Sequence, residues 1–450
     1  MPHKDQPIFI LGAGAWGLST AFHLNKAGYQ NITVFEAAES IPSQYSAGYD
    51  LNKIVRAEYE DSFYTDLALE AIRGWKTPEF GPYYHQTGYI VATSGKAPQK
   101  AKDHLEKALH SVSSHPTFAS QITPLKTDAG FRDAAWQFSG PLTGFAGYMN
   151  RLAGYAHSSD AMYGIWKLCA ARGVKFITGS AGKVIELTYA ETRGPNTRRC
   201  TSIRTADGQH HQAVTVICVL GAYAASLIPA VGNSVVARCW SVAHVQLNKT
   251  ESDYLRGLPV TNVRDLGFFF EPDPETRLFK LCPLGAGYTN TITTKAAGAR
   301  HSSTVSLPPD AAIGSLPAPQ DFIPADDERK LRRLLQETLP WLANRPFVDQ
   351  KLCWFADTAD SDYVIDFVPQ TLNSLVVVSG DSGHGFKMMP VFGKWVLNLL
   401  EAGQQDEARW KWRQDIEKKD WGDEVSWRIG ASKEVSDLIK EKRRLEQARL

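Results

Sequence analysis

The chain has 450 residues and a mass of 49.8 kDa, enough for two large domains or three of ordinary size. Hydrophobic residues make up 43% and charged residues 22%, a balance that is typical of a globular protein and excludes a disordered, collagenous or coiled-coil chain. The 49 Lys and Arg residues nearly cancel the 48 Asp and Glu residues, so the net charge of +1 gives no argument for a nucleic-acid partner.

The six cysteines are scattered, with no CxxC pair and no Cys/His spacing suited to zinc. We therefore expect no metal site, and few cysteines are typical of a reducing compartment. The first residues, MPHKDQP, lack the basic start and apolar core of a signal peptide. The uncharged stretch 213–237 is long enough to cross a membrane, but its Gly, Pro, Ser and Asn residues predict a buried strand, a turn and a short helix. The sequence thus predicts a soluble protein.

The clearest local pattern comes at the start of the chain. The apolar run Ile8 to Leu11 predicts a buried strand, which leads into a glycine-rich turn and a helix with apolar residues on one face. A second apolar run, Ile32 to Phe35, predicts a parallel strand. Together these elements form a predicted βαβ unit.

The turn of this unit matches the GxGxxG fingerprint of dinucleotide-binding proteins. The turn consists of Gly12, Ala13, Gly14, Ala15, Trp16 and Gly17, and Glu36 ends the second strand. Glycines there allow a tight turn and a close approach to pyrophosphate, the helix N-terminus binds the anion, and the acid accepts from a ribose. An acid at this place disfavours a 2′-phosphate, which leaves FAD or NAD, and a motif so close to residue 1 favours FAD.

Two further runs, VTVICVL at 214–220 and SLVVVSG at 374–380, repeat the pattern of a buried strand that ends at a glycine. Three such strands far apart in the sequence predict one nucleotide-binding sheet built from separated segments. We assign to this domain residues 1–85, 145–225 and 356–400. A second domain is predicted over residues 86–144 and 226–355.

The remaining segments carry weaker patterns. Residues 306–325 are rich in Pro, Ala and Ser and predict a surface loop, and a helix is predicted from Asp327 to Thr338. After residue 401 the composition changes to charged residues with interleaved Trp, which predicts a C-terminal helical tail over 401–450.

Several segments together make the chain resemble the FAD-dependent amine oxidases typified by monomeric sarcosine oxidase and fungal fructosyl amino acid oxidases (amadoriases). Fungal saccharopine, pipecolate and isoquinoline-forming oxidases belong to the same group. The segments are GAGAWGLSTAFHL (12–24), SAGYDLNKIVRAEY (46–59), PYYHQTG (82–88), GYAHSSDAM (154–162), VICVLGAYA (216–224), GFFFEP (267–272), KLCPLGAGYTN (280–290), LCWFADTAD (352–360), YVID (363–366) and SGHGFKMMP (382–390).

The resemblance implies an α/β fold in which a Rossmann-like FAD-binding domain is interleaved with an antiparallel-sheet α+β substrate domain, as in glutathione reductase and D-amino-acid oxidase. It implies oxidation of a secondary amine to an imine, with O2 reduced to H2O2. It also implies that Cys353 attaches covalently to the flavin 8α-methyl group, and that Cys218 and Cys282 are core residues. Other expected FAD contacts are Ser46, Lys53, Asp381, Gly383, Gly385, Phe386 and Lys387.

The same resemblance assigns roles around the flavin. Lys280 matches the lysine that promotes the reaction with O2, and a cation there would stabilise negative charge that develops on oxygen. Its neighbours Phe279 and Leu281 are apolar, so a strand with a period of two would turn Lys280 to the opposite face. Lys53 and His384 are the other expected catalytic residues.

Arg56 and Lys387 match the pair that holds the substrate carboxylate, because an Arg fork can grip a carboxylate and a Lys adds a compact charge. Phe269 is expected in the substrate pocket. Two positions depart from sarcosine oxidases: Leu284 stands where they have His, and Phe355 where they have Tyr. The resulting apolar walls favour a larger N-alkyl amino acid, aromatic ones included, over sarcosine.

Three alternatives stay open at this point. The substrate can be a fructosyl amino acid or peptide, saccharopine or pipecolate; the retained Arg56 and His384 argue against a fructosyl group. The chain can be a non-catalytic FAD-fold protein that binds a partner, although it retains Cys353, Lys280, Arg56 and Lys387. It can be an NAD-dependent dehydrogenase, which leaves the Cys353 motif unexplained.

The C-terminal tripeptide predicts a cellular location. The tripeptide Ala448-Arg449-Leu450 is similar to the peroxisomal S-K-L signal, so a peroxisomal protein is expected, with the cytoplasm as the alternative. We expect a small amino-acid-derived substrate and O2 as partners, no nucleic acid, no membrane and a monomer.

Overall fold

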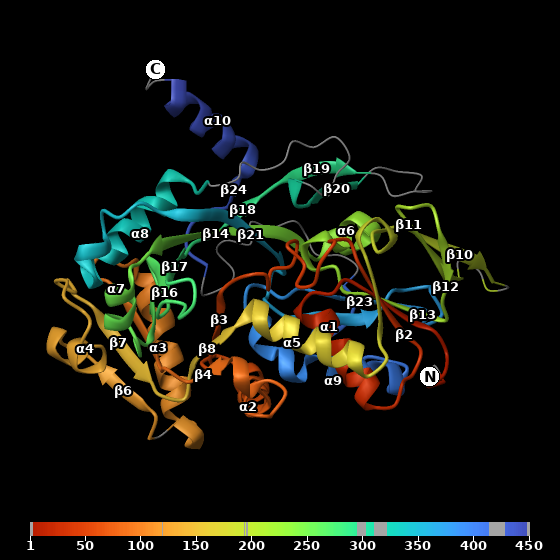
Figure 1. The fold of residues 1–450 in the computed structure, drawn as a ribbon, viewed down its shortest axis with the longest axis horizontal. Coiled ribbons are helices and arrows are strands. Elements are labelled where there is room, and N and C mark those ends of the chain that lie inside the picture. The colour runs from red at the N-terminus through yellow and green to blue at the C-terminus, as the bar shows by residue number, and fades with distance from the viewer. Residues whose placement is uncertain are drawn as a thin grey trace.

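A computed structural model describes residues 3–118, 120–192, 194, 197–294, 303–309, 322–413 and 428–447. In Figure 1 the N-terminal sheet and its helices occupy one half of the molecule, and the long strands β14 (Val236–Gln246) and β21 (Val348–Asp357) run across to the other half. Trp421, Trp427 and the last three residues, which carried sequence predictions, lie outside the described residues.

The first half contains a six-stranded sheet in the order β22-β23-β13-β1-β2-β9. Its strands are β1 (Ile8–Leu11), β2 (Ile32–Glu36), β9 (Lys175–Thr178), β13 (Thr215–Cys218), β22 (Val364–Phe367) and β23 (Leu375–Ser379). All neighbours are parallel except β22 and β23. The prediction that three distant buried runs form one sheet is confirmed, since β13 pairs with both β1 and β23.

Three helices cover this sheet: α1 (Ala15–Lys26), α5 (Ser158–Ala171) and α9 (Met389–Ala402). Helix α1 packs against both others. A Cβ added at Gly393 would lie 2.1 Å from the Ser19 carbonyl oxygen, so α9 reaches α1 only through a residue without a side chain. Beside them lie α2 (Ser62–Trp75), α6 (Ala224–Leu227) and a small sheet of β10 (Val184–Glu191), β11 (Arg198–Thr205) and β12 (His210–Gln212).

The second half is built on a ten-stranded mixed sheet, mostly antiparallel, whose path is β24-β18-β14-β17-β16-β15-β5-β7-β6, with β21 paired to β14. Besides β14 and β21, its strands are β5 (Tyr89–Thr93), β6 (Ile122–Leu125), β7 (Ala146–Asn150), β15 (Val260–Val263), β16 (Gly267–Phe269), β17 (Leu278–Pro283), β18 (Tyr288–Thr289) and β24 (Lys433–Glu434).

Helices α3 (Gln99–Ser113), α4 (Asp128–Ala134), α7 (Lys249–Tyr254) and α8 (Ala325–Thr338) belong to this second half. Leucines of α8 and aromatic residues of β16 and β17 share one buried core. Helix α8 confirms the predicted helix and adds two residues at its start. The two halves meet at a small antiparallel sheet of β3 (Asn52–Val55), β8 (Gly154–His157) and β4 (Tyr84–His85).

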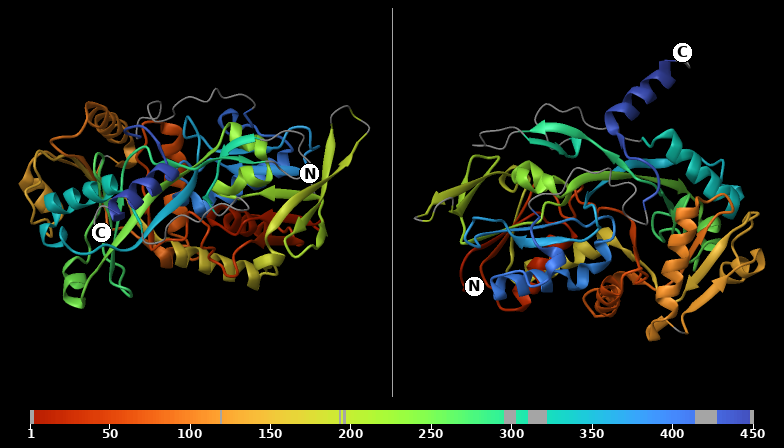
Figure 2. Two further views of the ribbon diagram at one scale, coloured as in Figure 1. Left: turned by 90° about the horizontal axis from the view of Figure 1, so that it is seen from above. Right: turned by 180° about the vertical axis from the view of Figure 1, so that it is seen from behind.

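The C-terminal segment is more closely packed than the sequence indicates. Trp410 is buried in the core of the first half, and β24 adds to the second sheet before α10 (Val435–Gln447), which projects outward in Figure 2. Arg428 is fully buried, where it bonds to the carboxylate of Asp357. The boundary predicted at residue 145 also differs from the strand pairing, because β7 lies between β5 and β6 in the second sheet.

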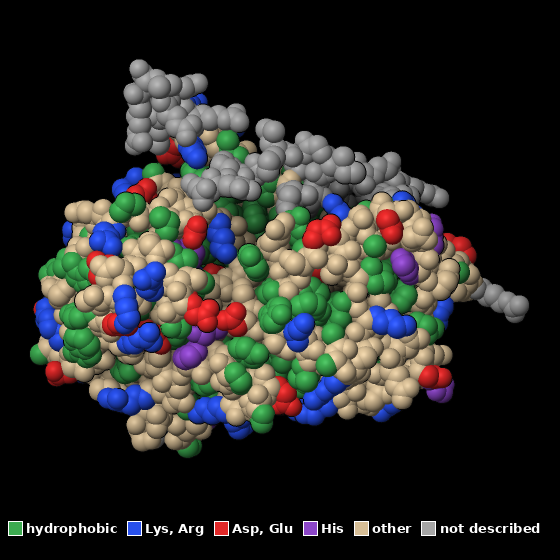
Figure 3. Space-filling view, viewed as in Figure 1, with side chains coloured by type: hydrophobic (Ala, Val, Ile, Leu, Met, Phe, Trp, Pro, Cys, Tyr) green, Lys and Arg blue, Asp and Glu red, His purple; other side chains and the backbone are tan. Residues whose placement is uncertain are grey.

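The stretch 213–237 folds as expected, with β13, a turn, the short α6 and the start of β14. Within the described ranges no helix is long and apolar enough to span a bilayer. The predicted loop over 306–325 lies largely outside the described residues, although β20 (Ser303–Ser306), which pairs with β19 (Thr291–Thr294), precedes it. On the face drawn in Figure 3, basic and acidic side chains are interspersed.

Candidate active site

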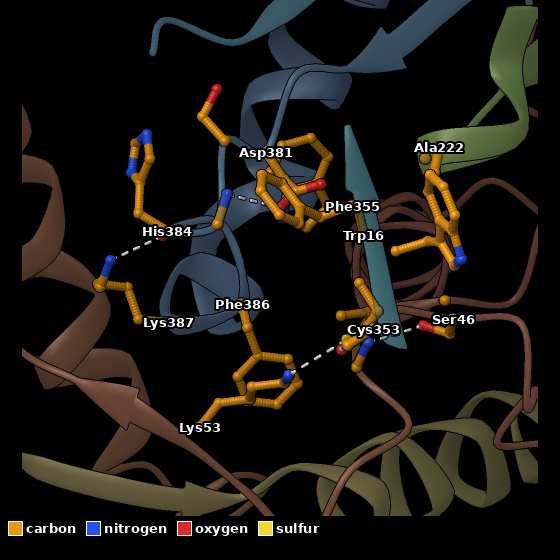
Figure 4. A pocket seen from close by; sticks show the side chains of 18 of the residues that line it. Trp16, Ser46, Lys53, Ala222, Cys353, Phe355, Asp381, His384, Phe386 and Lys387 are labelled. Atoms are coloured by element: carbon orange, nitrogen blue, oxygen red, sulfur yellow. Dashed lines mark hydrogen bonds between the residues drawn. The ribbon is translucent and has the colours of Figure 1, made fainter. Parts of the chain in front are cut away.

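A cavity of 670 Å³ receives residues from both halves of the molecule. Its wall contains the glycine turn after β1 at one side and the strands β15, β16, β17 and β21 at the other. Figure 4 looks into it: Trp16, Ser46 and Cys353 lie on one side, and His384 and Lys387 on the opposite side. The cavity thus joins the predicted cofactor site to the predicted substrate site.

The glycine turn has no room for side chains. Gly12 has a φ of +105°, and a Cβ there would lie 2.5 Å from the Val219 carbonyl oxygen. A Cβ at Gly17 would lie 1.9 Å from the Gly12 oxygen, so the start of α1 packs directly on the turn. Gly14 caps α1 without a side-chain hydrogen bond, which leaves the N–H groups of the first turn to a ligand.

Glu36 and Ser46 border this turn. The Glu36 carboxylate accepts from the Ala13 N–H at 2.8 Å and from the Ser43 hydroxyl at 2.7 Å, so it ties the end of β2 to the turn. Ser46 Oγ accepts from the Gly48 N–H at 3.1 Å and lies beside Gly14. Both side chains line the cavity, in agreement with their predicted place at a dinucleotide.

The loop after β23 supplies a further part of the wall. Asp381 accepts from the N–H groups of Ala356 and Gly383, and burial raises its pKa to about 6. A Cβ on Gly383 would lie 2.7 Å from the Trp240 ring. Gly385 was expected to approach the flavin, but a Cβ there would lie 2.4 Å from Trp16, so this glycine makes room for an indole. Phe386 lines the cavity.

Cys353 differs from the other five cysteines, all of which are buried. It lies on β21, is half-buried and lines the cavity, and its Sγ is 3.9 Å from the ammonium of Lys53. Figure 4 draws this contact. Cys282, which we expected only as a core residue, is buried but also lines the cavity, and burial raises the pKa of its thiol to about 11.

Lys280 and Lys53 share one carboxylate that the sequence did not single out. Asp50 Oδ2 lies 2.5 Å from Lys280 Nζ and 2.8 Å from Lys53 Nζ, and the Lys280 ammonium also donates to the Asn52 carbonyl. We call Asp50, Lys53 and Lys280 the lysine–aspartate cluster. Its only sequence signal is the position of Asp50 three residues before Lys53.

Burial disfavours the charged forms of the three side chains in this cluster, and the opposite charges of their partners favour them. Burial favours the protonated acid, yet the two ammonium groups hold the pKa of Asp50 far below its usual range. Burial likewise opposes the charge on Lys53, but Asp50 raises its pKa. Lys280 is 1% exposed, and burial lowers its pKa despite the pairing. The prediction that Lys280 lies on the strand face opposite to its apolar neighbours is therefore confirmed, and this face borders the cavity.

Arg56 and Lys387 are brought together around Tyr59, and we call these three residues the clamp. The guanidinium of Arg56 and the ammonium of Lys387 lie 5.0 and 5.1 Å from the centre of the Tyr59 ring. Lys387 Nζ bonds to the Tyr59 hydroxyl and the His384 carbonyl, whereas Arg56 donates to the Glu58 carbonyl. Burial and the nearby Arg56 lower the pKa of Lys387 well below its ordinary value.

His384 lines the cavity beside the clamp. Its Nε2 is 2.9 Å from the Ser361 carbonyl, so that nitrogen carries the proton, and Nδ1 accepts from the hydroxyls of Tyr59 and Tyr363. Burial and Lys387 keep its pKa well below the ordinary value, so the ring is neutral. Both ring nitrogens are thus hydrogen-bonded within the protein, and the catalytic role expected for His384 stays a prediction.

The apolar walls are as expected except at one residue. Leu284 and Phe355 line the cavity together with Trp240. Phe269 does not: it is fully buried beside Phe279 in the core of the second half. Side chains alternate along β16 and the residue after it, so Phe268 and Phe270 face the cavity and Phe269 faces away.

The glycine turn, the uncapped N-terminus of α1 and the cavity-facing Cys353 fit an FAD, and the comparisons with known proteins agree. The family model of FAD dependent oxidoreductases (DAO) matches residues 7–399, so the chain belongs to that family. Among curated proteins, L-saccharopine oxidase of Schizosaccharomyces pombe is 32% identical over 441 residues, which are 94% of this chain and 96% of that protein.

Solved structures give the same result. The fructosamine oxidase of Aspergillus fumigatus (Amadoriase II), in complex with FSA, has a TM-score of 0.84 and 32% identity, with 97% of each chain covered. The fructosyl peptide oxidase from E. terrenum has a TM-score of 0.87 and 28% identity, with 97% of this chain and 98% of that chain covered.

These comparisons confirm the family resemblance and the interleaved α/β architecture. The protein is an FAD-dependent oxidase that acts on the CH–NH group of amino-acid-like amines. The NAD-dependent and non-catalytic alternatives are thereby set aside.

Proposed function

We propose that the protein oxidises an N-substituted α-amino acid at its secondary amine to an imine. The observation that carries this proposal is the clamp, because Arg56 and Lys387 line the same cavity as the dinucleotide turn. Neither cation forms an ion pair with any side chain in the described part of the chain. A substrate carboxylate would complete the clamp, and charge-assisted bonds to it would fix the amine in the cavity.

Bound FAD supplies the two-electron acceptor for the amine and returns both electrons to O2. The substrate loses one hydrogen from carbon and one from nitrogen, and both hydrogens leave in H2O2. The clamp orients the carboxylate, and the walls of Trp240, Leu284 and Phe355 exclude water from the reacting bond.

We assign the reaction with O2 to Lys280. Its ammonium is buried, is paired with Asp50 and faces the cavity, so a positive charge stands ready where oxygen gains electrons. Lys53 shares Asp50 and lies nearer to Cys353, so it helps to set the charge at the cofactor rather than at the substrate.

We further propose that Cys353 carries the flavin through a thioether. It is half-buried and lines the cavity, and its Sγ lies 3.9 Å from the Lys53 ammonium. Protein precipitated in acid should stay yellow, and the Cys353 peptide should carry the mass of FAD; Cys282→Ser is the matched control. Release of intact flavin by acid would contradict the covalent bond and leave FAD binding untouched.

The substrate class is tested by H2O2 release from wild-type enzyme. The panel contains sarcosine, N-methyl aromatic amino acids, pipecolate, saccharopine and fructosyl-valine, each beside its amide or its decarboxylated amine. We expect oxidation of the acids and poor oxidation of the matched compounds. If N-methyltyramine is oxidised as well as N-methyltyrosine, the clamp is not used and the proposed substrate class is wrong.

A further inference from the structure

Glu58 is a buried carboxylate of the cavity wall that the proposed reaction does not use. It follows Arg56 by two residues, in the segment after β3 that also carries Tyr59, and it is 1% exposed. Its Oε1 accepts from the Asn150 amide at 2.6 Å, whereas its Oε2 has no hydrogen-bond partner within the described residues. Native structures leave few buried acceptors unsatisfied, so Oε2 is suited to a donor that a ligand brings.

The other carboxylates along the cavity already have partners. Asp381 and Glu36 accept from backbone N–H groups. The remaining ones contact the side chains of His104, Arg409 or Arg413, and they are Glu60, Asp61, Asp360 and Asp362. Glu58 therefore combines burial with an oxygen that the described residues leave without a donor.

Glu58 belongs to the surroundings of the clamp but bonds to neither cation through its carboxylate. Arg56 donates to the Glu58 backbone carbonyl, and Lys387 donates to the Tyr59 hydroxyl and the His384 carbonyl. Burial disfavours the charge on Arg56 and on Lys387, and the negative charge of Glu58 opposes that effect on the pKa of each. The carboxylate is thus close enough to act on both cations and is still open to a ligand.

The remaining titratable neighbours of Glu58 are phenols and one further cation. Burial raises the pKa of Tyr84, Tyr89 and Tyr148, and the charge of Glu58 adds to this, so the three phenols are neutral at pH 7. Arg264, which lines the cavity after β15, lies near Tyr89 and Tyr148. Among these groups Glu58 is the one that can accept a proton.

The clamp places the substrate nitrogen near this carboxylate. In an α-amino acid the nitrogen is about 2.5 Å from the carboxylate carbon, because both are attached to the same carbon atom. A substrate whose carboxylate binds Arg56 and Lys387 therefore carries its amine into the same part of the cavity. Alkylamines are protonated at pH 7, as the ordinary Lys pKa of about 10.4 shows, so this amine arrives as an ammonium with N–H donors.

An ammonium has to lose a proton before it can be oxidised. The nitrogen of an ammonium has no lone pair, and a lone pair is needed to form the C=N bond as hydrogen leaves the neighbouring carbon. A general base within hydrogen-bond reach of the N–H supplies this step. Glu58 Oε2 is an acceptor without a donor of its own, beside the residues that bind the substrate carboxylate.

We propose that Glu58 is the catalytic base that takes a proton from the substrate ammonium. The N–H bond breaks, the proton passes to Oε2, and the lone pair left on nitrogen forms the C=N bond as a hydride equivalent leaves the carbon. The ammonium thereby becomes a protonated imine. The proton and the hydride both end in H2O2, which returns Glu58 to its carboxylate form. This inference rests on the proposed function and adds a catalytic residue to it.

The first test is the pH dependence of anaerobic flavin reduction by the acid that the H2O2 panel selects. The rate constant of reduction divided by the substrate Kd is compared between wild-type holoenzyme and Glu58→Gln. The variant should lose about a hundredfold to a thousandfold at pH 7. Because free amine no longer needs a base, this loss should shrink by about tenfold per pH unit toward the amine pKa. A loss of the same size at every pH would overturn the proposal.

A matched pair of substrates makes the same comparison at one pH. N-(2,2,2-trifluoroethyl)glycine differs from N-ethylglycine only by its fluorines, which withdraw electrons and leave most of the amine unprotonated at pH 7. Glu58→Gln should slow flavin reduction by N-ethylglycine about a hundredfold and by the fluorinated compound less than about threefold. Equal losses for the two compounds would contradict a proton transfer to Glu58.

Binding is measured separately from the reaction. Methylthioacetate has the carboxylate but no amine, so its Kd, followed by flavin absorbance, should change less than about threefold in Glu58→Gln. A tenfold weaker Kd would mean that Glu58 holds the clamp in place and is not a base.

Two further variants serve as controls. Glu60→Gln removes one carboxylate from the same segment, where it contacts His104, and should keep the wild-type pH profile. Glu58→Asp keeps a carboxylate and should recover part of the rate at pH 7. Flavin content and melting temperature show whether each variant is folded.

The two proposals fail in different ways. If folded Glu58→Gln keeps the wild-type rate at pH 7, Glu58 is not the base, while the oxidase assignment stands. If no N-substituted amino acid reduces the flavin of wild-type enzyme anaerobically, the proposed function itself is wrong.

Discussion

Two groups of cationic side chains line the cavity, and they differ in whether the protein itself supplies a paired carboxylate. In the lysine–aspartate cluster, both cations are paired with the buried Asp50, so the protein supplies the counter-ion itself. In the clamp, Arg56 and Lys387 face each other's charge across Tyr59 with only neutral oxygens as partners. The pKa values do not divide along the same line: burial lowers those of Lys280 and Lys387, whereas Asp50 raises that of Lys53.

The cations of the lysine–aspartate cluster thus keep a paired carboxylate without a ligand, whereas those of the clamp gain one only when a ligand binds. A group that must act on oxygen in every turnover benefits from a counter-ion fixed by folding. In the clamp, Glu58 is a nearby anion, but neither Arg56 nor Lys387 has a carboxylate as a hydrogen-bond partner. A substrate carboxylate can therefore bind both cations directly.

The largest effect is expected at Asp50. Asp50→Asn leaves the buried Lys280 ammonium and the half-buried Lys53 ammonium without their anion and should lower the free energy of unfolding by about 3–5 kcal/mol, measured by denaturant titration. Because pairing depresses the folded pKa of Asp50, its contribution is present above the ordinary Asp pKa of about 3.9 and is lost only as pH falls toward the folded value. Lys53→Met combined with Asp50→Asn should recover part of the loss. Unchanged stability of Asp50→Asn would show that the cluster is not ionic.

The next effect concerns oxygen. Lys280→Met should slow the reoxidation of reduced flavin about a hundredfold to a thousandfold, since it removes the cation near the developing charge. Anaerobic reduction by substrate should change much less, which stopped-flow absorbance measures separately. Lys351→Met is the matched control, because Lys351 is near the cluster but bonds to the Tyr49 carbonyl. Equal losses in both half-reactions would contradict the role of Lys280.

The clamp should show a smaller effect that depends on substrate. Arg56→Met removes a charge-assisted contact of about 1.5–3 kcal/mol and should reduce kcat/KM for an N-methyl amino acid about tenfold to a hundredfold. The variant should also lose the preference for the acid over its amide. Arg56→Lys restores the charge without the guanidinium fork, so its kcat/KM should lie between those of the wild-type enzyme and Arg56→Met. If Arg56→Met keeps the preference for the acid over its amide, the substrate carboxylate binds elsewhere in the protein.

The smallest effect is a pH dependence of binding. The pKa of Lys387 is low in the free clamp, and a bound carboxylate should raise it, so binding takes up a proton between these two pKa values. The Kd of methylthioacetate, which has no amine, should therefore weaken as pH rises through that window, by at most about tenfold per pH unit. Flavin absorbance gives the Kd at each pH. Lys387→Met should remove the dependence, and a flat wild-type profile would show that Lys387 keeps its charge without ligand.

Sequence patterns were sufficient wherever the information is local. The period of apolar residues and the glycine spacing predicted β1, the glycine turn and α1, because each depends on neighbouring residues alone. The flanking apolar residues of Lys280 predicted its strand face for the same reason. The resemblance to the amine oxidases then supplied Cys353, Arg56 and Lys387, which the fold gathers around one cavity.

Contacts between residues far apart in the sequence became evident only from the tertiary structure. Asp50 and Lys280 are separated by 230 positions and Tyr59 and His384 by 325, and no local period encodes such a contact. Phe269 was misplaced because one step along a strand reverses the face, and the register is set by pairing with β15 and β17. The sequence by itself therefore determined the cofactor motif and the family, whereas burial and strand pairing decided which charges are paired and which are left for a ligand.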